Sequence, residues 1–207
     1  MMDARVEVRT YGEIFPARAE ILRYAGLGRG KEADAQTQAL LDKALSLSRG
    51  ALCGRVCFSY LPLSRKEGGL DLGFAVTNSV DLARALDGCD RILLLAATVG
   101  VELDRLILRE SRKSMAMGLL LGAIGTAAVE TLCDRFCQET GEALAKTGLC
   151  LSPRFSPGYG DLPLALQREI FAYLDCPRRI GLTLGESLLM TPAKSVTAIA
   201  GIRASTN

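Results

Sequence analysis

The segment with the most suggestive chemistry is 154–163, which reads Arg-Phe-Ser-Pro-Gly-Tyr-Gly-Asp-Leu-Pro. Arg154 carries a planar guanidinium that can hold a carboxylate through two parallel hydrogen bonds. Pro157 fixes one backbone angle, and Gly158 lets the backbone approach a ligand closely. Tyr159 offers a ring face to a cation or a base, and a hydroxyl at its tip. The segment suits a zwitterionic or sulfonium ligand, although its composition alone also fits an ordinary surface loop.

The cysteine spacing and the absence of histidine argue against several kinds of catalytic and metal site. The 207 residues contain no His, so imidazole-based triads and most catalytic zinc sites are ruled out. Seven cysteines, an odd number, and no signal-peptide pattern favour reduced thiols and a cytoplasmic location. The pairs Cys53/Cys57 and Cys133/Cys137 have three intervening residues, not the two of redox and zinc-ribbon motifs. A soft-metal site on one helix face is conceivable, but buried unreactive thiols are the simpler interpretation.

Charge and hydropathy argue against nucleic-acid and membrane partners. The net charge is +2, aromatic residues make up 5%, and there is no Trp, so we expect no nucleic-acid binding. The segment 115–129 carries no charge but is shorter than the roughly 20 apolar residues of a spanning helix. It predicts a buried core helix. The alternative is that its glycines form a small-residue face for packing within a membrane.

The elements that must position these residues follow from periodicity and from turn residues. Alternating or dense apolar runs predict strands at 5–9, 52–61, 91–97, 180–184 and 195–202. Helical spacing predicts helices at 17–24, 31–48, 80–86, 101–109, 114–144 and 164–174, with Ser79 and Asp161 as caps of two of them. The mixed order indicates an α+β fold, a single domain 1–207 with a mostly antiparallel sheet packed by helices. We divide it into an N-terminal helical lobe, 1–50, and a core, 51–207.

The long predicted helix 114–144 changes character at Glu130. Its first half is apolar all round, and from Glu130 onward it becomes amphipathic and charged. A helix that is apolar in its first half and charged in its second half is expected to run from the core toward a surface or cleft. Glu130 is therefore a candidate ligand contact, and the plainer interpretation is a solvated helix charge.

Three segments resemble the activation domain of cobalamin-dependent methionine synthase. The loop 154–163 is similar to that family's Arg-x-x-x-Gly-Tyr loop, which binds S-adenosylmethionine. The segment 181–201 is similar to its Thr-Glu-Ser, Pro and Ser-Val segment, and the helix around 128–130 resembles the one that supplies a ligand-facing carboxylate. The resemblance is specific over 123–201, and the earlier part resembles free-standing relatives of the domain. It implies an activation-domain-like fold.

The resemblance also implies roles for individual residues. Arg154 would pair with the ligand carboxylate, and Ser156 and Gly158 would lend backbone groups. Tyr159 would pack on the ligand, and Glu130 would accept a hydrogen bond from its ammonium or a hydroxyl.

Three departures from the family pattern affect the expected strength of binding. A ligand-facing acidic residue shortly before the loop is replaced by 146–148, Lys-Thr-Gly, and the family's late aromatic beyond Gly201 is missing. Gly185 stands where the family has Thr. We therefore expect a weaker site, or one that a partner completes.

The implied function is that of an accessory subunit of a methyltransferase in methionine biosynthesis. It would hold S-adenosylmethionine over cobalamin carried by a partner, while cob(II)alamin is reductively remethylated with an electron from a flavodoxin-like donor. Positioning alone suffices for this function, which agrees with a sequence that has no His. Two alternatives are a non-catalytic docking module for a corrinoid protein and an activator of another corrinoid methyltransferase.

Overall fold

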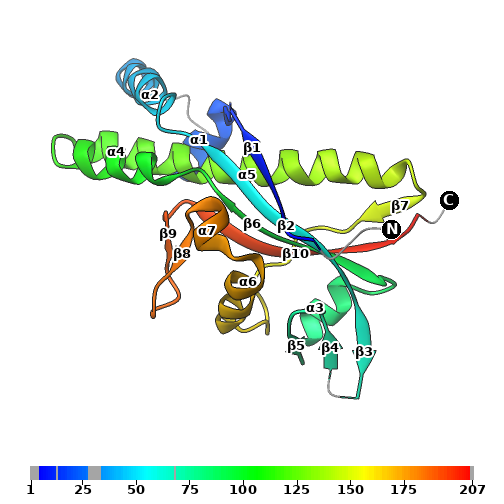
Figure 1. The fold of residues 1–207 in the computed structure, drawn as a ribbon. Helices are drawn as coiled ribbons and strands as arrows, with labels where there is room; N and C mark the ends of the chain where they lie inside the picture. The colour runs from blue at the N-terminus through cyan, green and yellow to red at the C-terminus, as the bar shows by residue number, and fades with distance from the viewer. Residues whose placement is uncertain (1–4, 13, 28–33, 68, 206–207) are drawn as a thin grey trace.

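A curved five-stranded antiparallel sheet forms the centre of the molecule (Figure 1). The structure is a computed structural model and describes residues 5–12, 14–27, 34–67 and 69–205. In spatial order the strands are β1 (Glu7–Tyr11), β2 (Gly54–Pro62), β6 (Arg91–Thr98), β10 (Ser195–Ala204) and β7 (Leu149–Leu151). Every pairing is antiparallel, which confirms the predicted sheet type and the α+β class.

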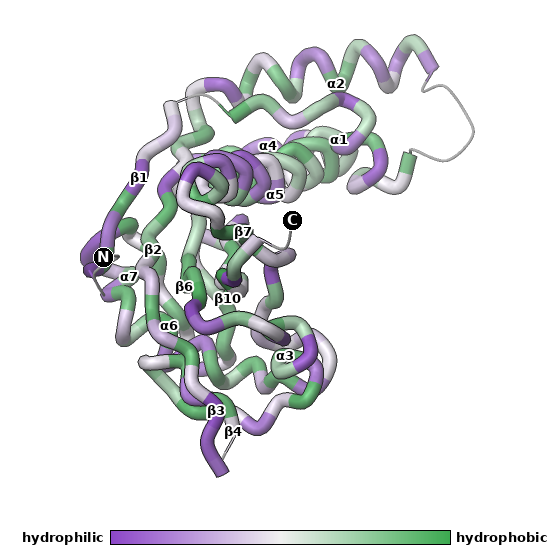
Figure 2. Tube along the Cα trace, turned by 90° about the vertical axis from the view of Figure 1, so that its right-hand side faces the viewer, coloured by the Kyte–Doolittle hydropathy of each residue, from purple (hydrophilic) through white to green (hydrophobic). Residues whose placement is uncertain are grey.

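The two middle strands are apolar on both faces because both faces are covered. In β6, Leu93 and Leu95 belong to one buried cluster, whereas Ile92 and Leu94 belong to the other. Successive side chains of a strand point to opposite faces, so a dense apolar run without alternation is the pattern of a strand buried on both sides. Figure 2 shows the resulting hydrophobic colouring along β6 and β10 between the two layers.

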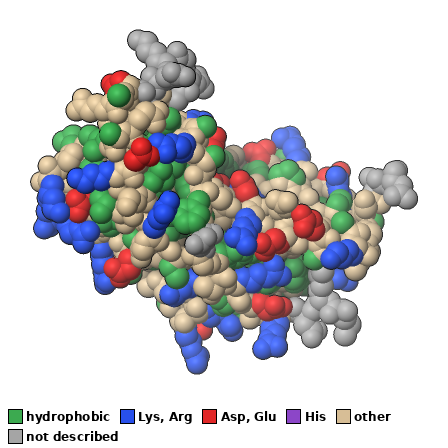
Figure 3. Space-filling model, turned by 90° about the horizontal axis from the view of Figure 1, so that it is seen from above, with side chains coloured by type: hydrophobic (Ala, Val, Ile, Leu, Met, Phe, Trp, Pro, Cys, Tyr) green, Lys and Arg blue, Asp and Glu red, His purple; other side chains and the backbone are tan. Residues whose placement is uncertain are grey.

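Four helices cover one face of the sheet. They are α1 (Arg18–Tyr24), α2 (Ala35–Ser48), α4 (Val101–Ser111) and α5 (Met115–Ala145), and the other three all pack on α5. Ser114 begins α5 by accepting a hydrogen bond from the Met117 N–H at 3.2 Å. The segment predicted as an N-terminal helical lobe, 1–50, contains α1 and α2 and also the edge strand β1. Seen from this helical side, acidic and basic side chains are interspersed over the surface (Figure 3).

Close packing of α4 on α5 accounts for Gly118 and Gly125. A Cβ atom at Gly125 would lie 2.5 Å from Leu103 Cδ2 on α4, so a larger residue would force the Leu103 side chain to move. The helix is long and apolar enough to cross a membrane by length and composition, but 67% of its most apolar window is buried inside the protein. This burial agrees with the prediction of a core helix.

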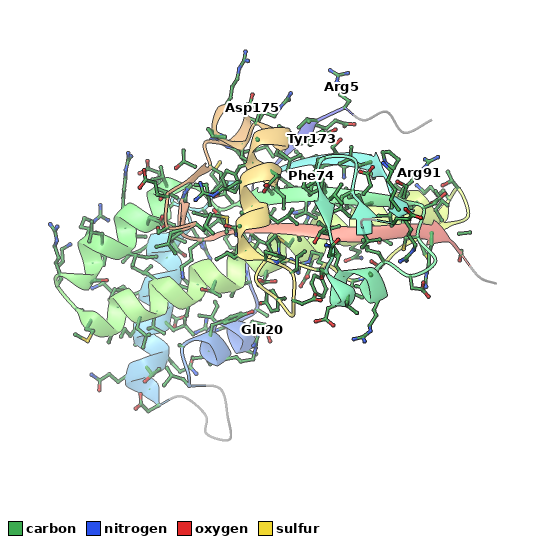
Figure 4. The ribbon with its side chains drawn as sticks, turned by 90° about the horizontal axis from the view of Figure 1, so that it is seen from below. Arg5, Glu20, Phe74, Arg91, Tyr173 and Asp175 are labelled. Atoms are coloured by element: carbon green, nitrogen blue, oxygen red, sulfur yellow. The ribbon has the colours of Figure 1, made fainter. Side chains whose placement is uncertain are left out.

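The opposite face carries short elements. The helical ones are α3 (Val80–Ala85), the 3₁₀ turn η1 (Leu164–Leu166), α6 (Gln167–Leu174) and α7 (Cys176–Ile180). One small sheet consists of β3 (Ser64–Lys66), β4 (Gly69–Asp71) and β5 (Val76–Thr77), and another of β8 (Thr183–Leu184) and β9 (Met190–Thr191). The rings of Phe74 and Tyr173, 6.0 Å apart, join the first small sheet to α6 (Figure 4).

Two predictions on this face were wrong. The strand expected at 180–184 is the end of α7 followed by the two residues of β8, because Pro177 in the first turn allows a short helix there. Asp161 was expected to cap the helix that follows it, but η1 has no side-chain cap. Asp161 caps α3 instead: it accepts hydrogen bonds from Ser79 Oγ and from the backbone N–H of Val80 at 2.7 Å. The expected Ser79 cap is present as well, with the Leu82 N–H donating to Ser79 Oγ at 3.0 Å.

Candidate functional site

A cavity of about 720 Å³ lies between α5, the beginning of β10 and the segment that follows β7. Its volume is within the range of pockets that bind drug-sized ligands and cofactors. The wall also includes the first residues of α6 and β9, so distant parts of the sequence meet here. The lining residues are Glu130, Asp134, Cys137, Ser152, Pro153, Arg154, Phe155, Ser156, Pro157, Tyr159, Gln167, Met190, Ser195, Val196 and Thr197.

Arg154 is held between two carboxylates of α5. Its Nη2 donates to Glu130 Oε2 at 3.1 Å and to Asp134 Oδ1 at 2.7 Å. Glu130 and Asp134 are four residues apart on the helix, so both project from the same face. The Arg154 side chain is only 18% exposed, whereas those of Glu130 and Asp134 are 40% and 74% exposed. The guanidinium therefore lies at the inner end of this ion cluster and the carboxylates at its outer end.

The electrostatics keep Arg154 charged and the neighbouring thiols neutral. Burial alone would lower the pKa of Arg154, but the negative charges of the Cys133 thiolate, which forms only at high pH, and of the Glu130 carboxylate outweigh burial, and the pKa is raised. Burial raises the pKa of Cys133 to about 12 and that of Cys137 to about 11, although nearby Arg154 opposes both shifts. Thiols with such pKa values are poor nucleophiles near neutral pH, because the thiolate is the reactive form. Cys137 thus contributes an inert wall to the cavity.

The loop from Arg154 to Asp161 is fastened at both ends. At one end Phe155 exchanges two backbone hydrogen bonds of 2.8 Å with Ile199 of β10. At the other end Asp161 binds the N-terminus of α3. Between them Gly158 has a positive φ of 93°, a conformation that favours glycine. The tight turn brings Tyr159 to the rim of the cavity, where it is 70% exposed.

The structure brings four of the five predicted site residues together around the cavity: Arg154, Ser156, Tyr159 and Glu130. Gly158 does not line it, and its backbone N–H donates to Leu162 O at 2.9 Å. The carbonyl of Ser156 accepts from the Tyr159 N–H at 3.2 Å. Two of the backbone groups expected to serve a ligand, the Gly158 N–H and the Ser156 carbonyl, are thus already paired inside the loop.

Several lining residues were not predicted from the sequence. The i, i+4 spacing of Asp134 from Glu130 was a usable signal, because such residues share a helix face. Thr197 lies in a strand that was predicted, but only the tertiary structure shows that the strand edge beside it is open. Gln167 carried no signal, since a polar residue at the start of a helix is ordinarily exposed. It is in fact 5% exposed.

The described residues around the cavity offer groups that can bind an organic ligand, and they contain no cluster of metal ligands. Among the described residues, no group of three or more His, Cys, Asp or Glu side chains is arranged to hold a metal ion. The cavity combines a charged end at Arg154 with an apolar wall that includes Phe155 and Met190. Such a combination fits an organic ligand with a charged head and a flat or apolar remainder.

Comparison with known structures gives the same fold. The protein is similar to the crystal structure of the MetH reactivation domain bound to AdoHcy, with a TM-score of 0.66 and 17% sequence identity, over 100% of this chain and 81% of that chain. No family model and no curated protein matches the sequence. An identity of 17% shows the fold alone. The protein therefore has the fold of the MetH reactivation domain, with mixed helices around a curled antiparallel sheet.

Proposed function

We propose that this protein binds S-adenosylmethionine in the cavity around Arg154 and serves as a reactivation subunit for a cobalamin-dependent methionine synthase. The observation that carries the proposal is the Arg154–Glu130–Asp134 cluster at the wall of a ligand-sized cavity. It occurs in a fold whose solved neighbour is a reactivation domain bound to AdoHcy.

The charges of the cavity complement this ligand. S-adenosylmethionine carries a carboxylate, an ammonium and a sulfonium, and so has a net positive charge. Among the lining residues, the cation of Arg154 faces two carboxylates, Glu130 and Asp134, which leaves a net negative charge. The outer, more exposed carboxylates suit the two cationic groups of the ligand.

Arg154 retains donors for the ligand carboxylate. Its hydrogen bonds to Glu130 and Asp134 both come from Nη2, and no partner within the described residues takes the N–H groups of Nε and Nη1. A guanidinium has five N–H donors, so one cation can bind the carboxylates of α5 and a ligand carboxylate together. Tyr159 at the rim offers a ring face to the cationic part of the ligand.

Positioning is the contribution that these residues make to the reaction. Cobalamin in the partner would supply the cobalt that receives the methyl group, and a flavodoxin-like donor would supply the electron. Cys137 stays protonated, the sequence has no His, and methyl transfer from a sulfonium needs no acid or base from the protein. Holding the methyl donor and the cobalt in one geometry by itself accelerates methyl transfer, because the reacting groups no longer have to meet by diffusion.

Calorimetric titration with S-adenosylmethionine tests the proposal. We expect the wild type to bind, and Arg154→Ala to weaken binding by roughly 1.5–3 kcal/mol, a tenfold or greater loss, because a charge-assisted pair is removed. Arg105→Ala is the matched control, since Arg105 is exposed on α4 and pairs with Glu102. Binding that both variants weaken equally, or that neither weakens, would contradict the location of the site.

The reactivation role needs a second measurement. An oxidised synthase that lacks its own reactivation domain should regain turnover when this protein, S-adenosylmethionine and a one-electron donor are added together. Ligand binding without recovery of turnover would limit the function to ligand binding, or to activation of a different corrinoid methyltransferase.

A docking module that binds no ligand is the second candidate. The internal pairing of Gly158 N–H favours it, because this group is then lost to a ligand. Association with a corrinoid protein that is unchanged by S-adenosylmethionine would support this candidate.

A further inference from the structure

The edge of β10 is open beside the cavity. Within the described residues, strand β7 pairs with β10 only from Ile202 to Ala204, and one isolated bridge joins Phe155 to Ile199. The N–H and C=O of Ile199 point away from β6, since both are bonded to Phe155. Backbone groups two residues apart on a strand point to the same side, so those of Thr197 also point away from β6. No backbone partner for them occurs in the described residues.

Two side-chain oxygens of residues that line the cavity are also unpaired. Thr197 Oγ1 and Gln167 Oε1 are buried and have no hydrogen-bond partner within the part of the protein that the structure describes. Thr197 is 2% exposed and Gln167 5%, and both line the cavity. By contrast Ser195, the preceding residue on the same face of the strand, is fully used: its Oγ bonds to Thr98 Oγ1 at 2.9 Å and to Pro192 O at 2.8 Å.

Such a cluster of unpaired groups requires an explanation. Buried polar atoms in folded proteins are nearly always hydrogen-bonded, and each exception has a cost in stability. Here the backbone N–H, the backbone carbonyl and the hydroxyl of Thr197 and the amide oxygen of Gln167 lack partners among the described residues, and both residues line the cavity. A ligand that brings its own donors and one acceptor would pair them.

We infer that Thr197 and Gln167 form the base-recognition wall of the cavity and select a 6-aminopurine. This inference rests on the proposed function and assigns the half of the ligand that the Arg154 cluster does not explain. The Thr197 carbonyl and Gln167 Oε1 are acceptors only, so they need N–H donors, and an exocyclic amine carries two. The Thr197 N–H in turn suits the adjacent ring nitrogen, which is an acceptor in adenine.

The surroundings fit a flat, uncharged ring. Phe155 and Met190 supply apolar surface beside these groups, and a flexible methionine adapts its shape to a ring. The charged amino-acid part of the ligand is matched at the other end, by Arg154 and the two carboxylates. Neutral, buried, directional groups are the kind that discriminate between bases, because a mismatched base leaves them unpaired.

A pair of ligands that differ only in the base tests the inference on the unmodified protein. We would titrate it with S-adenosylhomocysteine and with its inosine counterpart, in which a 6-oxo group replaces the 6-amino group and the ring nitrogen becomes a donor. We expect the inosine compound to bind at least about tenfold more weakly. Equal affinities would overturn the inference and leave the proposed function intact. Binding of neither compound would overturn both.

Variants then show which groups discriminate. Thr197→Pro removes the N–H that points out of the sheet edge, where proline is tolerated, together with the Thr197 hydroxyl, and Gln167→Leu removes the amide acceptor. Each should bring the affinity ratio of the two compounds toward one. Ser59→Ala is the matched control, because the Ser59 hydroxyl is equally buried and unpaired but does not line the cavity. A loss of affinity that leaves the ratio unchanged would mean a structural role for that residue and would contradict the inference.

Discussion

The two ends of the cavity satisfy their polar groups in different ways. At the charged end, Arg154, Glu130 and Asp134 bind one another, and the carboxylates are half-exposed or exposed. At the other end, Thr197 and Gln167 are almost fully buried and have unpaired oxygens. The charged groups are therefore paired with one another before a ligand arrives, with N–H groups of Arg154 to spare, whereas the oxygens of Thr197 and Gln167 are paired only by a ligand or by water. Affinity for a charged head and selectivity for a base are consequently expected to depend on different residues.

Removing both carboxylates should have the largest effect on the free protein. The variant Glu130→Gln with Asp134→Asn leaves the 18%-exposed Arg154 without a counter-charge. We expect a loss of about 1 kcal/mol in the free energy of unfolding, a value reduced because the carboxylates are solvated. The melting temperature in thermal denaturation measures it. An unchanged melting temperature would show that the charged end is not held together by this ion cluster.

The fastening of the loop gives a smaller effect that depends on pH. The hydrogen bond from Ser79, with those from backbone N–H groups of α3, holds the pKa of Asp161 below its ordinary value of 3.8. A lowered folded-state pKa contributes stability above the unfolded-state value, and this stability is lost as the pH falls through the folded-state value. Asp161→Asn should therefore lower the melting temperature at neutral pH and approach the wild type in acid.

Two outcomes would contradict this interpretation of Asp161. One is a difference between variant and wild type that is constant with pH, and the other is no difference at all. Asp42→Asn is the control, since Asp42 pairs with Arg18 at an exposed position where little stability is expected.

The smallest effect on the free protein should come from Thr197→Val. The substitution replaces an unpaired buried hydroxyl by a methyl of similar shape, so we expect a change within about 0.5 kcal/mol, or slight stabilisation. Chemical denaturation measures it. A clear loss of stability would mean that the hydroxyl is well hydrogen-bonded in the free protein, for instance by water, and the contrast between the two ends would then be weaker.

The sequence predicted most of the elements because their signals are local. The apolar run 91–97 became β6, and the helix expected at 114–144 is α5 within one residue at each end. Ser79 caps α3 as expected, since a cap depends on neighbouring residues only. Strand β7 was missed because three residues give no periodicity to detect.

The site could be predicted only in part, for a similar reason. The loop with Arg154 and Tyr159 was visible from residue types and from family resemblance, and Glu130 from the change in character of its helix. The roles of Asp161 and Thr197 depend on contacts between distant segments: Asp161 binds α3, which lies about eighty residues earlier in the sequence. Whether a strand edge is open, as at Thr197, depends on where a neighbouring strand stops, and composition does not encode this.

The position of Glu130 and Asp134 on α5 has a consequence for hydrogen exchange around the cavity. The same helix carries the main buried cluster, and α1, α2 and α4 all pack on it. Amide hydrogens on this wall should therefore exchange with solvent only when the whole molecule unfolds, while those of the loop around Gly158 exchange through local opening. Bound ligand would then slow exchange on one side of the cavity selectively. Ligand-dependent protection is therefore expected in the loop and not in α5.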